Sequence, residues 1–180
     1  MSRSTTPKNT SASASRKGAA SGGTPATVAL ERAGAQFGVR SFDNDIAPGE
    51  LGYGKAAAAA LGVSEQRVFK TLLVEATGPV RHAVAIVPVS GQLSLKAMAA
   101  AIGAKKADML EARTAERLTG YVVGGISPFG QKKSLPTVVD ASALDHETIF
   151  VSGGKRGLDI EIAPHALLTV LGAVSAAISA

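Results

Sequence analysis

A loop rich in glycine, proline and lysine, residues 124–136, lies between two short runs of β-branched residues. These runs, residues 121–123 and 137–140, have the composition of strands, so a strand–loop–strand unit is predicted. Glycine allows positive φ and lets a ligand approach the backbone closely, and Lys132 and Lys133 add positive charge to the same loop. The pattern is typical of a pocket wall for an anionic ligand. An ordinary connection that collects glycine and proline is the alternative.

Residues 68–89 are predicted to form a β-hairpin. Residues 68–74 and 80–89 are mainly apolar, and a Thr-Gly-Pro turn lies between them. Lys70 is the one charged residue of the first run, and a period of two places it on a face with three apolar residues. Such a lysine either faces solvent or lies in a cleft beside a counter-charge. Its apolar neighbours favour a functional cation, with a solvated lysine as the alternative.

The remaining elements follow from capping residues and periodicity. Helices are predicted at residues 25–33, 55–61, 95–102, 113–118 and 164–172, and further strands at 36–42, 148–152 and 158–162. A basic turn at 153–157 joins the last two strands. In the final strand Asp159 lies opposite the isoleucines, so an ordinary surface position stays open for it. Hairpins separated by helices, without a βαβα rhythm, predict an α/β fold with a mixed, mostly antiparallel sheet closing toward a barrel, with flanking helices.

Charge is divided unevenly along the chain. Residues 1–23 carry four basic residues, no acidic ones and no Val, Ile, Leu or Phe, so a disordered basic tail is predicted. A solvated tail, a transit peptide and an RNA-contacting arm remain open for this segment. Residues 24–180 hold 15 basic and 14 acidic residues. They are predicted to form one domain that contacts nucleic acid only through a local patch.

Several common functional patterns are missing from the sequence. No run of about 18 apolar residues occurs, so no membrane span is predicted. The chain has no cysteine, and His82, His146 and His165 are scattered singly, so no metal site is predicted. Gly52-Tyr53-Gly54 lacks the third glycine of a dinucleotide fingerprint, and Gln131 replaces the lysine of a near P-loop. Without a G-x-S-x-G elbow, the chain offers no obvious nucleophile of its own.

Six strings of the sequence occur in an order that resembles a known family. They are residues 68–74 (VFKTLLV), 88–93 (PVSGQL), 103–106 (GAKK), 119–128 (TGYVVGGISP), 131–133 (QKK) and 151–161 (VSGGKRGLDIE). Together they resemble the bacterial YbaK-type Cys-tRNA(Pro) deacylases. The resemblance covers nearly everything from Thr24 to the final helix and is more specific than any single motif above.

The resemblance implies a free-standing editing domain that removes mischarged cysteine from tRNA(Pro). It implies a mixed sheet closing toward a barrel, action together with prolyl-tRNA synthetase, a cytoplasmic location and no cofactor. The substrate's own thiol would attack its ester and give a thiolactone, which explains how a site without a nucleophile could work. A noncatalytic module that binds the tRNA acceptor end or the synthetase is the alternative.

The resemblance also implies site residues. Lys70 matches the family's essential lysine, Gly124 lies in its substrate-cradling loop, and Asp159 matches its pocket aspartate. Phe42 stands where the family has a tyrosine, so a role for that hydroxyl is in doubt here. The other residues expected to bind substrate are Gly125, Ile126, Ser127, Pro128, Lys132, Lys133, Gly153, Gly154, Lys155 and Arg156.

Overall fold

The computed structural model describes residues 23–43 and 52–180. The predicted tail, apart from Gly23, lies outside the described residues. The elements are α1 (Pro25–Arg32), β1 (Gly38–Ser41), α2 (Gly52–Leu61), η2 (Glu65–Arg67), β2 (Phe69–Thr77), β3 (His82–Pro88), α3 (Leu95–Ala101), β4 (Lys106–Met109), α4 (Ala112–Thr119), β5 (Thr137–Asp140), η3 (Ala141–Asp145), β6 (Ile149–Lys155), β7 (Leu158–Ile162), α5 (Pro164–Leu171) and β8 (Val174–Ala176).

The strands form two sheets. One is an antiparallel sheet of order β1-β7-β6, and the other is a mixed sheet of order β4-β2-β3-β5-β8 in which only the β3–β5 and β5–β8 pairs are parallel. The prediction of a mixed, mostly antiparallel α/β fold with flanking helices is therefore confirmed. Closure into a barrel is not seen among the described residues. Strand β2 pairs with β3 and β4, and the residue before it, Val68, makes only an isolated bridge to Phe150 of the other sheet.

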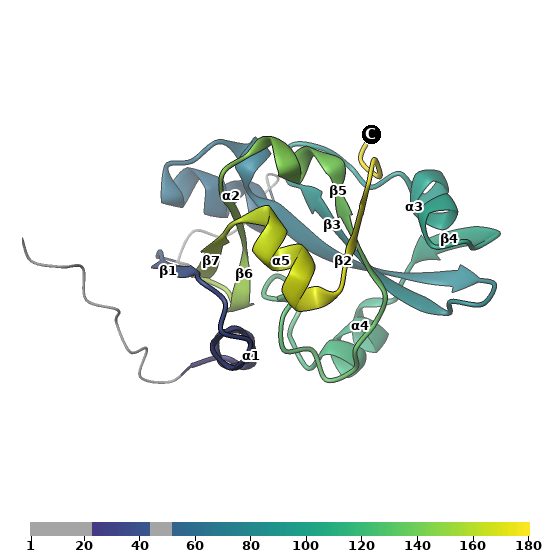
Figure 1. Ribbon diagram of the computed structural model, residues 1–180, viewed down its shortest axis with the longest axis horizontal. Coiled ribbons are helices and arrows are strands. Elements are labelled where there is room, and N and C mark those ends of the chain that lie inside the picture. The colour runs from purple at the N-terminus through teal and green to yellow at the C-terminus, as the bar shows by residue number, and fades with distance from the viewer. Residues whose placement is uncertain (1–22, 44–51) are drawn as a thin grey trace, which may run out of the picture.

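The two larger of three groups of buried side chains hold the layers together. The larger joins both sheets to α1 and α5, and it includes Phe69, Ile86, Ile160 and Leu167. Helix α5 packs against this group beside both sheets (Figure 1), while α3 covers the other face of the mixed sheet around Met98. Fully burying side chains of this size stabilises a fold by roughly 1.5–3 kcal/mol each. The sheets are therefore fixed relative to each other at the end where β2 begins.

The predicted helices are confirmed, and their ends follow local chemistry. Thr24 accepts a hydrogen bond from the Thr27 amide, and Ser94 caps α3 through the Ala97 amide. Gly120 ends α4 with a φ of 80°, in the left-handed region where residues with a side chain are strained. Helix α2 begins three residues earlier than the alanine run alone predicts. Within the described residues, no helix has the length and apolar character needed to span a membrane.

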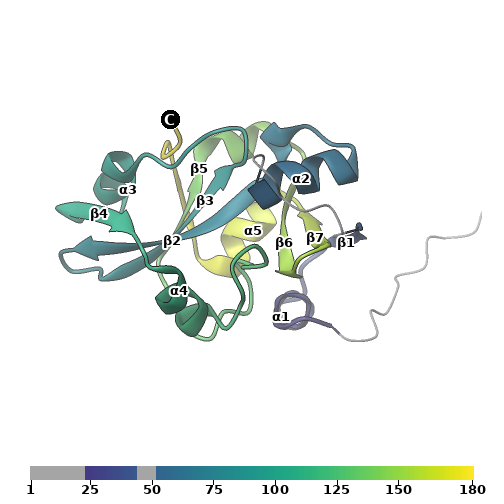
Figure 2. The same ribbon diagram turned by 180° about the vertical axis from the view of Figure 1, so that it is seen from behind.

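Three predictions of local structure are wrong. Residues 121–123 are not a strand, because the chain turns after Gly120 and the Gly125 amide bonds to the Val122 carbonyl at 2.9 Å. Strands β4 and β8 were not predicted, since each has only three or four residues. The turn predicted at 153–157 is shorter, because β6 continues to Lys155 with a register shift after Ser152. In Figure 2, β6 and β7 lie side by side between α2 and α1, and the end of β6 at Lys155 packs against Gly125 of the glycine loop.

Candidate functional site

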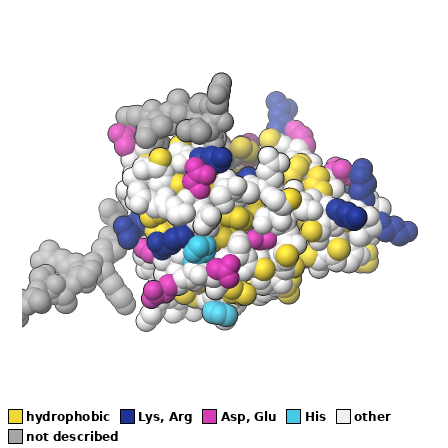
Figure 3. Space-filling model, turned by 90° about the horizontal axis from the view of Figure 1, so that it is seen from above, with side chains coloured by type: hydrophobic (Ala, Val, Ile, Leu, Met, Phe, Trp, Pro, Cys, Tyr) yellow, Lys and Arg dark blue, Asp and Glu magenta, His cyan; other side chains and the backbone are white. Residues whose placement is uncertain are grey.

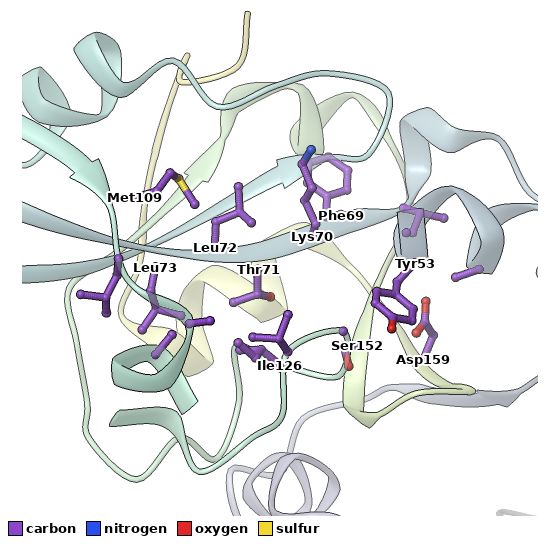
Figure 4. Close-up of a pocket in the computed structure, with 18 residues that line it drawn as sticks. Tyr53, Phe69, Lys70, Thr71, Leu72, Leu73, Met109, Ile126, Ser152 and Asp159 are labelled. Atoms are coloured by element: carbon purple, nitrogen blue, oxygen red, sulfur yellow. The ribbon is translucent and has the colours of Figure 1, made fainter. Parts of the chain in front are cut away.

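A cavity of about 380 Å³ lies where the start of β2 meets the start of α2, the glycine loop and the β6–β7 hairpin. Its lining includes three of the expected catalytic residues, Lys70, Gly124 and Asp159. Ile126 also borders it, and Leu73 and Leu110 contribute to an apolar end (Figure 4). The size and the mixture of apolar walls with a few polar groups are typical of a site for a small ligand.

Lys70 lies beside the cavity with its ammonium at one edge. The side chain is half-buried, and Nζ donates a hydrogen bond to the Gly91 carbonyl at 3.1 Å. In Figure 4 the ammonium points away from Ile126 and Ser152. Among the described residues it forms no ion pair with a carboxylate. Burial, and then the charge of Lys55, lower the pKa of Lys70.

The glycine loop reaches the cavity at Gly124, whose φ is +91°. A Cβ at this position would lie 2.7 Å from Arg156 Nε and 3.0 Å from the Tyr53 ring. Gly125 packs against the β6–β7 turn, since its Cβ would lie 3.0 Å from the Cα of Lys155. The two glycines therefore let three separate segments meet at one end of the cavity.

Asp159 is buried, with 7% of its surface exposed, so the alternative of an ordinary surface acid does not hold. It lies on β7, the central strand of the small sheet, and its neighbours in the ladder are Arg40 and Ser152. Its carboxyl borders the cavity and accepts no hydrogen bond within the part of the chain that the structure describes. Burial raises the pKa of Asp159 to about 7. A cationic ligand in the cavity would favour the ionised carboxylate.

The raised pKa predicts how stability depends on pH. Below pH 3.8 the Asp159 carboxyl is protonated in both the folded and the unfolded chain, and between there and about pH 7 only the folded chain keeps the proton. As pH rises through this window, the free energy of unfolding should therefore fall, and the contribution of Asp159 to that fall is on the order of 2–4 kcal/mol. Asp159→Asn has no such proton. Urea unfolding at pH 4, 6 and 8 should show the variant gaining on the wild-type protein as pH rises, whereas a constant difference would contradict the assignment.

Several expected substrate-binding residues do not border the cavity. Ser127 and Pro128 are buried, and the Ser127 hydroxyl accepts a hydrogen bond from the Phe129 amide. Tyr121 donates to the Phe129 carbonyl at 2.6 Å, and a Cβ at Gly130 would collide with the Pro25 carbonyl of α1. This half of the glycine loop therefore packs into the protein and supports the half that carries Gly124.

The expected basic residues are dispersed. The stem of Lys132 packs on Gly120, and Lys133 lies near His82, whose pKa is lowered by burial and then by Arg81 and Lys133. Neither lysine borders the cavity. On the face shown in Figure 3, basic side chains stand in separate groups near the ends of the molecule, with hydrophobic side chains between them. A single broad basic surface is not present on this face.

The β6–β7 hairpin contributes to the site mainly through backbone contacts and not through free basic side chains. Gly153 accepts a hydrogen bond from the Thr24 hydroxyl, and Gly154, with φ +103°, lies against the Tyr121 ring. Lys155 is exposed. The Arg156 guanidinium donates to the Val123 carbonyl at 2.9 Å and stacks 4.1 Å from the centre of the Tyr53 ring. Arg156 therefore joins the hairpin to the glycine loop.

Tyr53 is a cavity residue that the sequence interpretation missed. It borders the main cavity and also a smaller one shared with Phe42 and Arg156. A lone tyrosine between two glycines gives no local signal beyond an incomplete dinucleotide motif. Phe42 borders only the smaller cavity, and its amide donates to the Gly157 carbonyl. Among the described residues, no group of three or more acidic or histidine side chains is placed to hold a metal ion.

Comparison with known proteins gives a consistent family. Residues 53–170 match the model of the aminoacyl-tRNA editing domain. EbsC of Enterococcus faecalis (strain ATCC 700802 / V583), which is assigned as a Cys-tRNA(Pro)/Cys-tRNA(Cys) deacylase, is 44% identical over 118 residues. The match covers 64% of this chain and 70% of EbsC.

Solved structures share the fold. The hypothetical protein APE2540 superposes with a TM-score of 0.74 at 24% identity, covering 87% of this chain and 100% of its own. A protein assigned as a trans-editing enzyme for prolyl tRNA synthetase gives the same TM-score and identity, covering 87% of this chain and 95% of its own. At this level of identity the likeness speaks to the fold alone.

Proposed function

The chain belongs to the aminoacyl-tRNA editing domain family, and on that premise we propose that it is a trans-editing deacylase that removes cysteine from mischarged tRNA(Pro). The observation that carries the proposal is the cavity that joins Lys70, Gly124 and Asp159. These residues are far apart in the sequence, yet the two sheets and the glycine loop bring them to one site. A fixed cation, a glycine backbone and a buried carboxyl suit an aminoacyl ester attached to RNA.

The ester carbonyl is proposed to lie against the glycine loop. The Gly125 amide is already bonded to Val122, whereas the amides of Gly124 and Ile126 donate no hydrogen bond within the described residues. Backbone N–H groups at such positions stabilise the oxyanion that develops during acyl transfer, and one donor is worth about 3–4 kcal/mol in other enzymes. The α-ammonium group of the substrate would face Asp159, and the ammonium of Lys70 would hold the phosphate or terminal nucleoside at the cavity edge.

The attacking group is proposed to come from the substrate. The cysteine sulfur bonds to the carbonyl carbon, the ester C–O bond breaks, and the thiol proton ends on the ribose hydroxyl, leaving free tRNA and a thiolactone. Good orientation can give such an intramolecular attack an effective molarity on the order of 10⁵ M or more. Specificity follows from the same step, because a side chain without a thiol cannot make the attack. A pocket that sorted small side chains by fit alone would gain only about 1–3 kcal/mol.

Prolyl-tRNA synthetase is the proposed partner, because it produces the mischarged substrate. Contact with the tRNA acceptor end is proposed for the exposed Lys132, Lys133 and Lys155, each through salt-sensitive phosphate contacts. Their separation from the cavity is compatible with this role, since the acceptor stem extends beyond the ester. Arg156 is already engaged with Val123 and Tyr53, so we propose a positioning role for it.

Deacylation assays test the proposal directly. Purified protein is incubated with Cys-tRNA(Pro), Ala-tRNA(Pro) and Pro-tRNA(Pro), and the remaining aminoacyl ester is measured with time. We expect loss of the cysteinyl ester, little loss of the alanyl ester and retention of the prolyl ester. A noncatalytic module that binds the acceptor end would release no amino acid from any of the three while still shifting the tRNA in a binding assay.

A further inference from the structure

Tyr53 occupies a fixed position at the polar end of the cavity. Its ring lies under the Arg156 guanidinium, 4.1 Å from ring centre to Cζ, and Gly124 leaves room for the ring on the other side of the turn. A stacked cation of this kind restrains a ring that is 38% exposed. The side chain therefore has a defined direction although it stands at the protein surface.

The Tyr53 hydroxyl and the Asp159 carboxyl lie at the same end of the cavity in Figure 4. Both residues border the same cavity. Within residues 23–43 and 52–180 neither the phenol nor the carboxyl has a hydrogen-bond partner, and they do not bond to each other. A hydroxyl and a buried carboxyl that face one space without partners are suited to a ligand that donates more than one hydrogen bond. Phe42, which borders only the smaller cavity beside Tyr53, has no hydroxyl to offer.

We infer that the Tyr53 hydroxyl completes, opposite Asp159, the binding site for the α-ammonium group of the aminoacyl ester, and that this pair selects substrates with a free primary amine. The inference rests on the proposed deacylase function. A primary ammonium has three N–H donors, enough for the carboxylate, the phenol oxygen and one further acceptor. The secondary ammonium of a prolyl ester has two N–H donors and carries one ring carbon, Cδ, in place of the third. The pair would therefore add to the protection of correctly charged tRNA.

Substrates that differ only at the nitrogen test this inference. Cys-tRNA(Pro) and N-acetyl-Cys-tRNA(Pro) share the thiol and the ester, but acetylation replaces the ammonium by a neutral amide. The measured quantity is the selectivity, the ratio of kcat/KM for the free amine to kcat/KM for the acetylated form. Tyr53→Phe keeps the ring under Arg156 and removes only the hydroxyl, so it should lower the selectivity about 10-fold by slowing the free-amine substrate alone. Its melting temperature should not change.

The other tyrosine of the chain is a matched control. Tyr121→Phe removes a hydroxyl that is buried and bonded to the Phe129 carbonyl, so it should lower the melting temperature and leave the selectivity unchanged. A Tyr53→Phe variant with wild-type selectivity would overturn the inference. Equal turnover of both substrates by the wild-type protein would also overturn it, and would leave the deacylase function standing. A wild-type protein inactive on Cys-tRNA(Pro) would instead refute the proposed function.

Discussion

Replacing Lys70 by alanine is expected to lower kcat/KM for Cys-tRNA(Pro) about 100- to 1000-fold, because it removes a charged contact to the substrate from a partly desolvated position. The fold should survive. Among the described residues the ammonium makes one hydrogen bond, to the Gly91 carbonyl, and removing a half-buried charge together with that bond changes stability by about 1 kcal/mol or less. Single-turnover deacylation and thermal unfolding measure the two effects separately.

Lys106→Ala is the control for this loss of charge. Lys106 is exposed and pairs with Asp108 at the outer strand of the mixed sheet, away from the cavity lining. The Lys106→Ala substitution removes one positive charge, as Lys70→Ala does, so a kcat/KM near the wild-type value is expected. If Lys70→Ala kept most of the rate, the lysine would have no part in holding the substrate, and the role given to the cavity edge would have to be withdrawn.

Gly124→Ala should be at least as damaging to activity, with a loss of about 100-fold or more, because the oxyanion donors of the loop would move. A methyl group at this position would lie 2.7 Å from Arg156 Nε and 3.0 Å from the Tyr53 ring, so one of the three segments must shift. The backbone, at φ +91°, is strained by any side chain. Stability should therefore fall by about 1–3 kcal/mol, as measured by denaturant unfolding.

Gly34→Ala separates backbone strain from the steric clash with Arg156 and Tyr53. Gly34 also has a positive φ, +68°, but a Cβ there would meet nothing within 4 Å. This variant should lose about 1 kcal/mol of stability from the backbone alone and keep its deacylase activity. Full activity in Gly124→Ala, with the same loss of stability as Gly34→Ala, would show that the glycine is needed only for its backbone conformation.

Much of the fold could be predicted because its signals are local. Helix α1 begins at Pro25 after the N-cap Thr24, α3 follows the N-cap Ser94, and α5 ends before the C-cap Gly172, and all three follow from capping chemistry. The hairpin of β2 and β3 followed from two long apolar runs. The short edge strands had no comparable signal, since three or four residues do not establish a period. The open arrangement of the sheets depends on which edges pair, which no local pattern records.

The site was predictable only in part, for reasons that lie in tertiary structure. The resemblance led to Lys70, Gly124 and Asp159, and the fold places all three at one cavity. Alternation alone left an ordinary surface position open for Asp159, but the residue lines the cavity together with Tyr53 of α2 and Gly124 of the glycine loop. Composition made Lys132 and Lys133 look like part of the pocket wall, whereas the loop folds inward at Ser127 and carries them elsewhere.

Tyr53 shows most clearly which site residues the sequence alone does not identify. Its importance comes from Arg156, more than one hundred residues later in the chain, whose guanidinium stacks on its ring. Neither residue predicts the other from the sequence. Stacking of this kind depends on how α2 is docked against the β6–β7 hairpin, so only the three-dimensional structure could identify it.

The central claim is that the protein positions a mischarged ester while the substrate's own thiol breaks it. Single-turnover deacylation of Cys-tRNA(Pro) and Ser-tRNA(Pro) tests this most directly, because the two substrates share the ester and the free amine and differ by one sulfur atom. The account predicts rapid loss of the cysteinyl ester and a rate for the seryl ester close to that of uncatalysed hydrolysis. Comparable enzymatic rates for the two esters would contradict it.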